Sequence, residues 1–275
     1  IGAGNIGTIL AFSLSRKKLG NITLVDVVDG LAEGKCLDLS QSLSIENLNL
    51  EINGTTKLSQ IKNSDAIIIT AGIARKPGMS RDDLIETNFS IMAEIGKAIK
   101  KYSPNSFVIC ITNPLDAMVW SLLKTSGLKE NMVVGMAGIL DTSRFKLFLS
   151  NEIGVSMDCI QTMVLGGHGD SMVPVPQFST VNGIAITELL PQEKIEEINE
   201  RTKHGGAEIV KHLKTGSAFY APSSSAVAMV EAILLDTNRI LPACAYLEGE
   251  YGINNLYCGV PVSLGKDGVN KVIEL

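Results

Sequence analysis

Continuous apolar runs in the first half of the chain constrain its fold more than any other feature. Polar and apolar residues do not alternate in them, as expected for strands covered on both faces of a parallel sheet. The four runs lie at residues 21–28, 65–72, 106–113 and 132–138. Helix-like segments precede or separate them at residues 5–19, 30–43, 81–101 and 114–126. Strands that alternate with helices predict an α/β domain with a doubly wound parallel sheet.

The second half of the chain has a different character. Residues 157–186 are rich in strand and turn residues, and helical stretches follow at residues 192–213 and 222–237. Two further strand-like segments, RILPACAYLEG and NNLYCGVPVSLG, resemble an antiparallel pair. We therefore expect a mixed α+β domain over residues 140–275. It is expected to pack tightly on the first domain, residues 1–139, with a cleft between the two.

Composition argues against several classes of protein. The net charge of -5 is unlike that of a nucleic-acid-binding protein, which usually carries a basic surface. No apolar run approaches the roughly 20 residues that span a bilayer. The five cysteines are widely spaced without a C-x-x-C pair, which favours core packing, and the three histidines lie far apart in the sequence. We therefore expect no bound metal.

A glycine cluster opens the chain. Residues Gly2, Gly4 and Gly7, with Asn5 and Ile6 between them, match the pattern G-x-G-x-x-G. In a dinucleotide-binding loop the first glycine makes a tight turn, the second admits a pyrophosphate, and the third allows close helix–strand packing. The phosphates then lie at the positive end of the helix that begins near Asn5. The pattern alone also fits a purely structural glycine turn.

Asp26 makes the dinucleotide interpretation the stronger one. It lies near the end of the next strand-like run, some 20 residues after the glycines, where a carboxylate can accept hydrogen bonds from an adenosine ribose. A carboxylate there repels the 2′-phosphate of NADP, and no arginine neighbours it. The cofactor predicted from these residues is NAD, although a strand-end carboxylate without a ligand would look the same.

Two short segments in the middle of the chain combine titratable and cationic groups. GGHGDSMVP places His168 among glycines, which give an imidazole room to face a ligand. LDTSRF places Asp141 and Arg144 three residues apart, on one face at the start of a helix. Asp141 can orient His168 and favour its protonated form, and Arg144 can hold a carboxylate with two parallel hydrogen bonds. The alternatives are a structural histidine and a local ion pair within the helix.

A third segment, GIARKPGMSRDDL, carries further cationic side chains. Arg75, Lys76 and Arg81 surround a Pro-Gly turn between a strand and a helix. Arg81 falls in the first helical turn, where the helix dipole disfavours positive charge. A residue that breaks a local rule in this way is a candidate ligand-binding residue. The other interpretation is a solvated surface loop.

Through these motifs together, the chain resembles the lactate/malate dehydrogenase family over essentially its whole length. GAGNIG, ITNPLD, LDTSRF and GGHGDSMVP occur in the family's order and spacing, which is far more specific than any one of them. ARKPGMSRDDL and TGSAFYAP add a similarity to the lactate-dehydrogenase-like branch of malate dehydrogenases. The resemblance implies a Rossmann NAD domain followed by a substrate domain.

The resemblance also implies a role for each site residue. His168 exchanges the proton, Asp141 stabilises its imidazolium, and Arg144 binds the carboxylate beside the reacting carbon. Arg81 polarises the carbonyl, and Asn113 contacts both substrate and nicotinamide. The remaining implied site residues are Asn88 and the Ile111–Asn113 strand end on the cofactor side, and Ser217 near the substrate. The Asn113–Pro114 peptide is implied to be cis.

Arg75 favours malate and oxaloacetate as the substrate pair. Lactate dehydrogenases typically present a glutamine at this position, matched to the methyl group of pyruvate. In a closed cleft, an arginine opposite a methyl group would be an unpaired buried cation, whereas the distal carboxylate of oxaloacetate would pair it. We expect NAD-linked oxidation of (S)-malate. The alternatives are an L-lactate or other 2-hydroxyacid dehydrogenase and, more remotely, a non-catalytic NAD-binding protein.

The family context yields the remaining expectations. We expect a homodimer or a homotetramer, and a cytoplasmic enzyme of the tricarboxylic acid cycle, with a mitochondrial location left open. No nucleic-acid or membrane partner is expected. We also expect a longer natural chain, with a central strand before Ile1 and a helix after Leu275.

Overall fold

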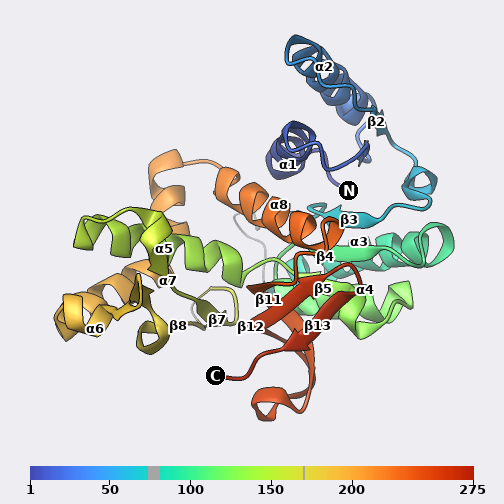
Figure 1. Cartoon of the computed structure of the whole chain (residues 1–275). Helices are drawn as coiled ribbons and strands as arrows, with labels where there is room; N and C mark the ends of the chain where they lie inside the picture. Colours follow the sequence, from blue (N-terminus) through green and yellow to red (C-terminus); the bar gives the residue numbers. More distant parts are fainter. Residues whose placement is uncertain (74–80, 170) are drawn as a thin grey trace.

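The computed structural model describes residues 1–73, 81–169 and 171–275. Strands and helices alternate through its first half (Figure 1). The strands are β1 (Ile22–Val25), β2 (Ile52–Thr55), β3 (Ala66–Ile69), β4 (Phe107–Cys110) and β5 (Val133–Gly135). The helices are α1 (Asn5–Arg16), α2 (Leu31–Ile45), α3 (Arg81–Tyr102) and α4 (Leu115–Ser126). The pairs β1–β2, β3–β4 and β4–β5 are all parallel, which confirms the predicted doubly wound α/β architecture.

The strand β2 was not predicted from the sequence. Its residues, INGT, include two that are poor strand formers and carry no apolar run. Gly54 is needed there because α2 lies against the strand: a Cβ at this position would collide with the backbone of Ala32. The close approach of helix and strand therefore explains why a glycine occupies a strand position.

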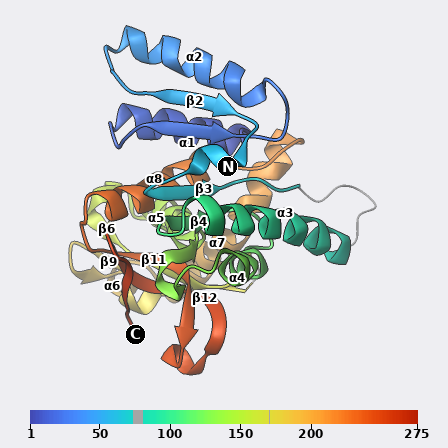
Figure 2. The ribbon, with the colours of Figure 1, turned by 90° about the vertical axis from the view of Figure 1, so that its right-hand side faces the viewer.

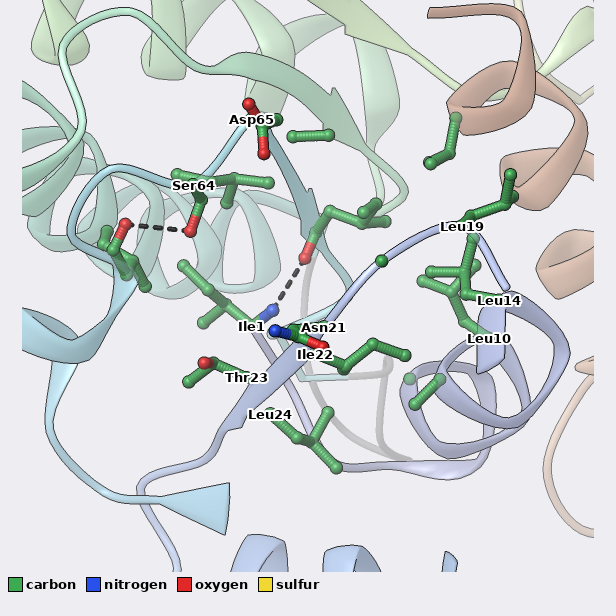
Figure 3. Close-up of a pocket in the computed structure, with 18 of the residues that line it drawn as sticks. Ile1, Leu10, Leu14, Leu19, Asn21, Ile22, Thr23, Leu24, Ser64 and Asp65 are labelled. Carbon is green, nitrogen blue, oxygen red and sulfur yellow. Dashed lines mark hydrogen bonds between the residues drawn. The ribbon is translucent and has the colours of Figure 1, made fainter. Parts of the chain in front are cut away.

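The parallel strands form two separate groups, with Ile1 and Gly2 between them. The amide of Gly2 donates to Val25 O of β1 at 2.7 Å, and the amide of Thr70, just after β3, donates to Ile1 O at 2.8 Å. A cavity of about 400 Å³ lies between the two groups, lined by residues of α1, β1 and β3 (Figure 3). Gly2 and Gly7 of the glycine loop line the cavity, whereas His168 and Asp141 do not.

The second half contributes both helices and further strands to the molecule. The helices are α5 (Gly138–Ile153), α6 (Ile186–Leu189), α7 (Gln192–Leu213) and α8 (Tyr220–Leu234). Short strands lie at β6 (Ile160–Gln161), β7 (Val164–Gly166), β8 (Met172–Pro174), β9 (Thr180–Val181) and β10 (Ile184–Ala185). The last three strands are β11 (Arg239–Glu248), β12 (Asn254–Gly265) and β13 (Gly268–Val272). The pairing of β11 with β12 is antiparallel, as predicted.

One sheet joins the two halves. Its strand order is β13-β12-β11-β5-β4-β3, and β11 meets β5 antiparallel at the pair Cys244 and Gly135. Buried side chains of α3 and α4 pack on one face of this sheet, and those of α1 and α8 pack on the other. Figure 1 shows α6 and α7 to one side of this core, and Figure 2 shows α2 and β2 above it.

The two halves also meet at the glycine loop. The Ser223 hydroxyl of α8 donates to Ile6 O of α1 at 3.0 Å, so a residue of the second half fixes the first turn of α1. Through the described ranges, no helix has the length and apolar character needed to cross a membrane.

Candidate functional site

The glycine loop owes its shape to two buried glycines. Gly2 has φ +105°, and a Cβ there would lie 2.5 Å from Thr70 Oγ1 and 2.7 Å from the Ala71 amide. A Cβ at Gly7 would collide with the carbonyl oxygen of Gly2. Neither position therefore accepts a side chain without a change in the path of the chain.

Gly4 differs from both of these glycines. It is exposed, and a Cβ at its position would meet no atom within 4 Å. It is also the N-cap of α1 and has no side chain that could accept from the helix, and the first turn of α1 holds no acidic residue. Open space beside free helical N–H groups, at the positive end of a helix dipole, fits a pyrophosphate.

Asp26 follows β1 and lies against the same loop. Its Oδ2 accepts from the Ala3 amide at 2.6 Å, and its Oδ1 accepts from the Val28 amide at 3.0 Å. Hydrogen bonds between a carboxylate and backbone N–H groups are among the stronger ones in proteins, so the Asp26 side chain is held in one orientation. Each carboxylate oxygen retains acceptor capacity for a ribose hydroxyl.

Asn88 is fully buried in α3 and links two segments of the site. Its Oδ1 accepts from the Ile73 amide at 2.9 Å, and its Nδ2 donates to Ile73 O at 3.2 Å and to Asn113 O at 2.8 Å. Ile111 is also buried, whereas Asn113 is exposed, and the Asn113–Pro114 peptide is cis, as predicted. Asn88 therefore holds the end of the β4 segment and the residue after Gly72 together.

His168, Asp141 and Arg144 form a hydrogen-bonded cluster. Asp141 lies in the first turn of α5, and only 2% of its side chain is exposed. Its Oδ2 is 2.9 Å from His168 Nδ1, and its Oδ1 accepts from an Arg144 guanidinium nitrogen at 2.8 Å. The buried carboxylate therefore holds the imidazole and the guanidinium in fixed orientations. Because Asp141 engages Nδ1, Nε2 is the ring nitrogen that can exchange a proton with a ligand.

The side chain of Arg144 packs against two glycines that the sequence analysis did not identify. A Cβ at Gly205 of α7 would lie 2.9 Å from Arg144 Cδ, and one at Gly206 would lie 3.4 Å from a terminal guanidinium nitrogen. Arg144 Nε is buried, and none of the described residues accepts a hydrogen bond from it. Two adjacent glycines inside a helix cost stability, which is a signal that could have marked them.

Two buried thiols lie in the six-stranded sheet, Cys110 in β4 and Cys244 in β11. Burial raises the pKa of the Cys110 thiol to about 12. Burial and the nearby Asp116 charge raise the pKa of the Cys244 thiol, which donates to Asp116 Oδ1 at 3.1 Å. All five cysteines are free, and these two stay protonated, consistent with the predicted packing role. No group of three metal-ligating side chains occurs in the described part of the chain.

Two sequence-predicted side chains lie outside the described residues, and a third predicted residue is exposed. Arg75 lies in the segment 74–80, outside the described residues, as does the side chain of Arg81, whose backbone begins α3. Ser217 is exposed in the segment between α7 and α8, and within the described ranges no hydrogen bond connects it to His168.

The chain combines a glycine loop that fits a pyrophosphate with a histidine–carboxylate–arginine cluster on an α/β fold. This combination is typical of NAD-dependent oxidoreductases. The profile of the lactate/malate dehydrogenase NAD binding domain matches residues 1–135, and that of the lactate/malate dehydrogenase alpha/beta C-terminal domain matches residues 139–275. The chain belongs to the lactate/malate dehydrogenase family, and its cofactor is NAD.

The similar solved structures include both malate dehydrogenases and lactate dehydrogenases. Malate dehydrogenase from Picrophilus torridus is 47% identical with a TM-score of 0.97, covering 100% of this chain and 88% of that one. Malate dehydrogenase from Cryptosporidium parvum is 44% identical with a TM-score of 0.96, covering 100% and 89%. Lactate dehydrogenase from Eimeria maxima, solved with NADH and oxamate, is 42% identical with a TM-score of 0.97, covering 100% and 86%.

Proposed function

We propose that this protein is an NAD-dependent malate dehydrogenase that interconverts (S)-malate and oxaloacetate. The observation that carries the dehydrogenase chemistry is the cluster in which buried Asp141 holds both His168 and Arg144, whereas the choice of malate rests on Arg75. Malate dehydrogenases also predominate among the similar solved structures, at 36% to 47% identity. Residues 1–139 would hold the NAD, and residues 140–275 would supply most of the substrate site.

Each residue of the cluster has one task in this proposal. NAD⁺, held by the glycine loop and Asp26, would supply the hydride acceptor for C2 of malate. His168 takes the hydroxyl proton at Nε2, and the Asp141 carboxylate, 2.9 Å from Nδ1, stabilises the resulting imidazolium. Arg144 binds the carboxylate next to the reacting carbon through guanidinium N–H groups other than the one that it donates to Asp141. In the reverse direction the protonated His168 favours oxaloacetate.

The neighbouring residues complete the proposed site. Arg81 would polarise the carbonyl oxygen, and Asn113 would contact the substrate and the nicotinamide side. Ser217 would lie near the substrate. Asn88, buried and bonded to Asn113 O, would support the cofactor side of the pocket through that contact. Gly2, Gly4 and Gly7, with Asn5, Ile6, Asp26 and Ile111, would complete the NAD site.

Arg75 is the residue on which the choice of malate rests. A guanidinium in a closed site with only a methyl group opposite would be a buried unpaired charge, which is strongly unfavourable. A distal carboxylate, as in malate and oxaloacetate, would pair it in a bidentate arrangement. An L-lactate dehydrogenase is the second candidate, because a lactate dehydrogenase at 42% identity shares this fold.

The substitution Arg75→Gln tests the proposal. Relative to the parent enzyme, the ratio of kcat/KM for oxaloacetate to that for pyruvate is expected to fall by a factor that corresponds to about 1–3 kcal/mol in transition-state binding. The measurement is the loss of NADH absorbance at 340 nm with each substrate. An unchanged ratio would show that Arg75 does not discriminate between the two.

We also propose that the enzyme is a homodimer or a homotetramer. The support is an apolar outer face on α2, where Leu37 is 62% exposed and Ile45 is 83% exposed. A contiguous apolar patch is typical of a surface that a partner covers, and these two side chains would contribute to one. Sedimentation velocity would distinguish these states from a monomer.

A further inference from the structure

A lysine of α2 reaches the glycine loop, and the sequence motifs do not account for it. Lys35 lies one turn into α2, and its Nζ donates to Ala3 O at 2.6 Å. The residue is half-buried between the helix and the loop. Gly54 makes this reach possible, because the missing side chain lets the start of α2 lie directly against β2.

A lysine side chain loses considerable entropy when it is held in one geometry, as Lys35 is by its hydrogen bond to Ala3 O. A lysine that only solubilised the surface of α2 would be expected to extend into water. The hydrogen bond to Ala3 O therefore suggests a specific task at the loop.

Lys35 and Asp26 hold Ala3 from opposite sides. Asp26 accepts from the Ala3 amide at 2.6 Å, while Lys35 donates to the Ala3 carbonyl, which also accepts from Thr8 Oγ1 at 3.3 Å. The Ala3–Gly4 peptide is planar, so its carbonyl and the Gly4 N–H point in opposite directions. A fixed Ala3 carbonyl therefore fixes the direction of the Gly4 N–H, at the glycine with open space beside it.

We propose that Lys35 is a positioning residue of the NAD site. Its ammonium orients the Ala3–Gly4 peptide so that the Gly4 N–H meets the pyrophosphate of the dinucleotide. Its positive charge also offsets the repulsion between that pyrophosphate and the Asp26 carboxylate on the same loop. The inference rests on NAD binding, which family membership shows, and is independent of the choice between malate and lactate.

The test compares ligands that contain the pyrophosphate with one that lacks it. The dissociation constants of NADH and ADP-ribose are measured by calorimetry for the parent protein and for Lys35→Met, and that of adenosine by displacement of NADH. We expect Lys35→Met to weaken NADH and ADP-ribose by about tenfold, as expected for loss of a charge-assisted hydrogen bond, and to leave adenosine unchanged. Lys35→Arg, which keeps the charge and the donors, should stay within about threefold of the parent.

Two controls separate this role from a general effect on charge or folding. Lys57→Met removes an exposed lysine from the same half of the domain and should not change the three dissociation constants. If Lys35→Met does not fold, Lys35→Gln, which retains an amide donor without the charge, takes its place. Unchanged ADP-ribose binding, or an equal loss for adenosine and ADP-ribose, would overturn the proposal.

Discussion

The two ends of the site are built from different parts of the chain. At the glycine loop, the groups proposed to face the cofactor are backbone atoms, and the loop depends on residues without side chains, such as Gly2 and Gly4. At the other end, the groups proposed to face the substrate are side chains of His168 and Arg144, held by buried Asp141. The first end depends on empty space and on peptide orientation, and the second on charge and proton exchange.

This difference predicts opposite responses to substitution. Adding a methyl group to the loop should damage cofactor binding or folding without touching the chemistry. Removing a side chain from the cluster should damage the chemistry while the fold and the cofactor affinity persist. The following substitutions are arranged to break that contrast if it is wrong.

The largest expected effect is that of His168→Asn. The asparagine amide can still donate to Asp141, so the local packing is preserved, but it cannot exchange a proton. We expect kcat with oxaloacetate to fall by about 10²–10⁴-fold, with an unchanged dissociation constant for NADH. Steady-state kinetics and NADH fluorescence titration measure the two quantities. Substantial residual kcat would mean that another group transfers the proton.

The next effect separates two glycines of one loop. Gly2→Ala places a Cβ 2.5 Å from Thr70 Oγ1 at φ +105°, so the free energy of unfolding should fall by more than about 2 kcal/mol. Gly4→Ala meets no neighbour and has φ -69°, so its unfolding midpoint should not change. The dissociation constant of NADH should still rise about tenfold for Gly4→Ala, because the methyl group takes space needed by the pyrophosphate. Equal denaturation midpoints for both variants would contradict this account of the loop.

The smallest expected effect is that of a substitution at Gly205, the glycine that packs against Arg144. In Gly205→Ala the new Cβ lies 2.9 Å from Arg144 Cδ, so the arginine must shift. We expect KM for oxaloacetate to rise about three- to tenfold with NADH affinity unchanged, since a displaced arginine loses part of a bidentate contact. Gly206→Ala, with its Cβ at 3.4 Å, is the milder matched control. A change in NADH affinity would blur the division between the two ends.

Local patterns were sufficient to predict much of the fold. The apolar runs marked β1, β3, β4 and β5, and the amphipathic segment at residues 192–213 matches α7. The strands β2 (INGT) and β13 (GVNKV) were not predicted, because neither has a continuous apolar run. Both are defined by their neighbours: β2 pairs with β1 and lies under α2, and β13 pairs with β12.

The site shows the same limit. Gly2, Gly4 and Asp26 follow from a motif with fixed spacing, and the pairing of Asp141 with His168 followed from charge and from the glycines around the histidine. Lys35 could not be found in this way, and the glycine pair at Gly205 marks an unusual helix position without revealing what it contacts. Their contacts, with Ala3 and Arg144, depend on how α2 and α7 pack, and local sequence does not encode that packing.

The most direct test of the proposed function is the substrate selectivity of the unmodified enzyme. With NADH as cofactor, kcat/KM is measured for oxaloacetate and for pyruvate from the absorbance at 340 nm. The account predicts a clear preference for oxaloacetate, because a dicarboxylate pairs both Arg75 and Arg144. A preference for pyruvate would contradict it and would assign the protein to the lactate dehydrogenases of the same family.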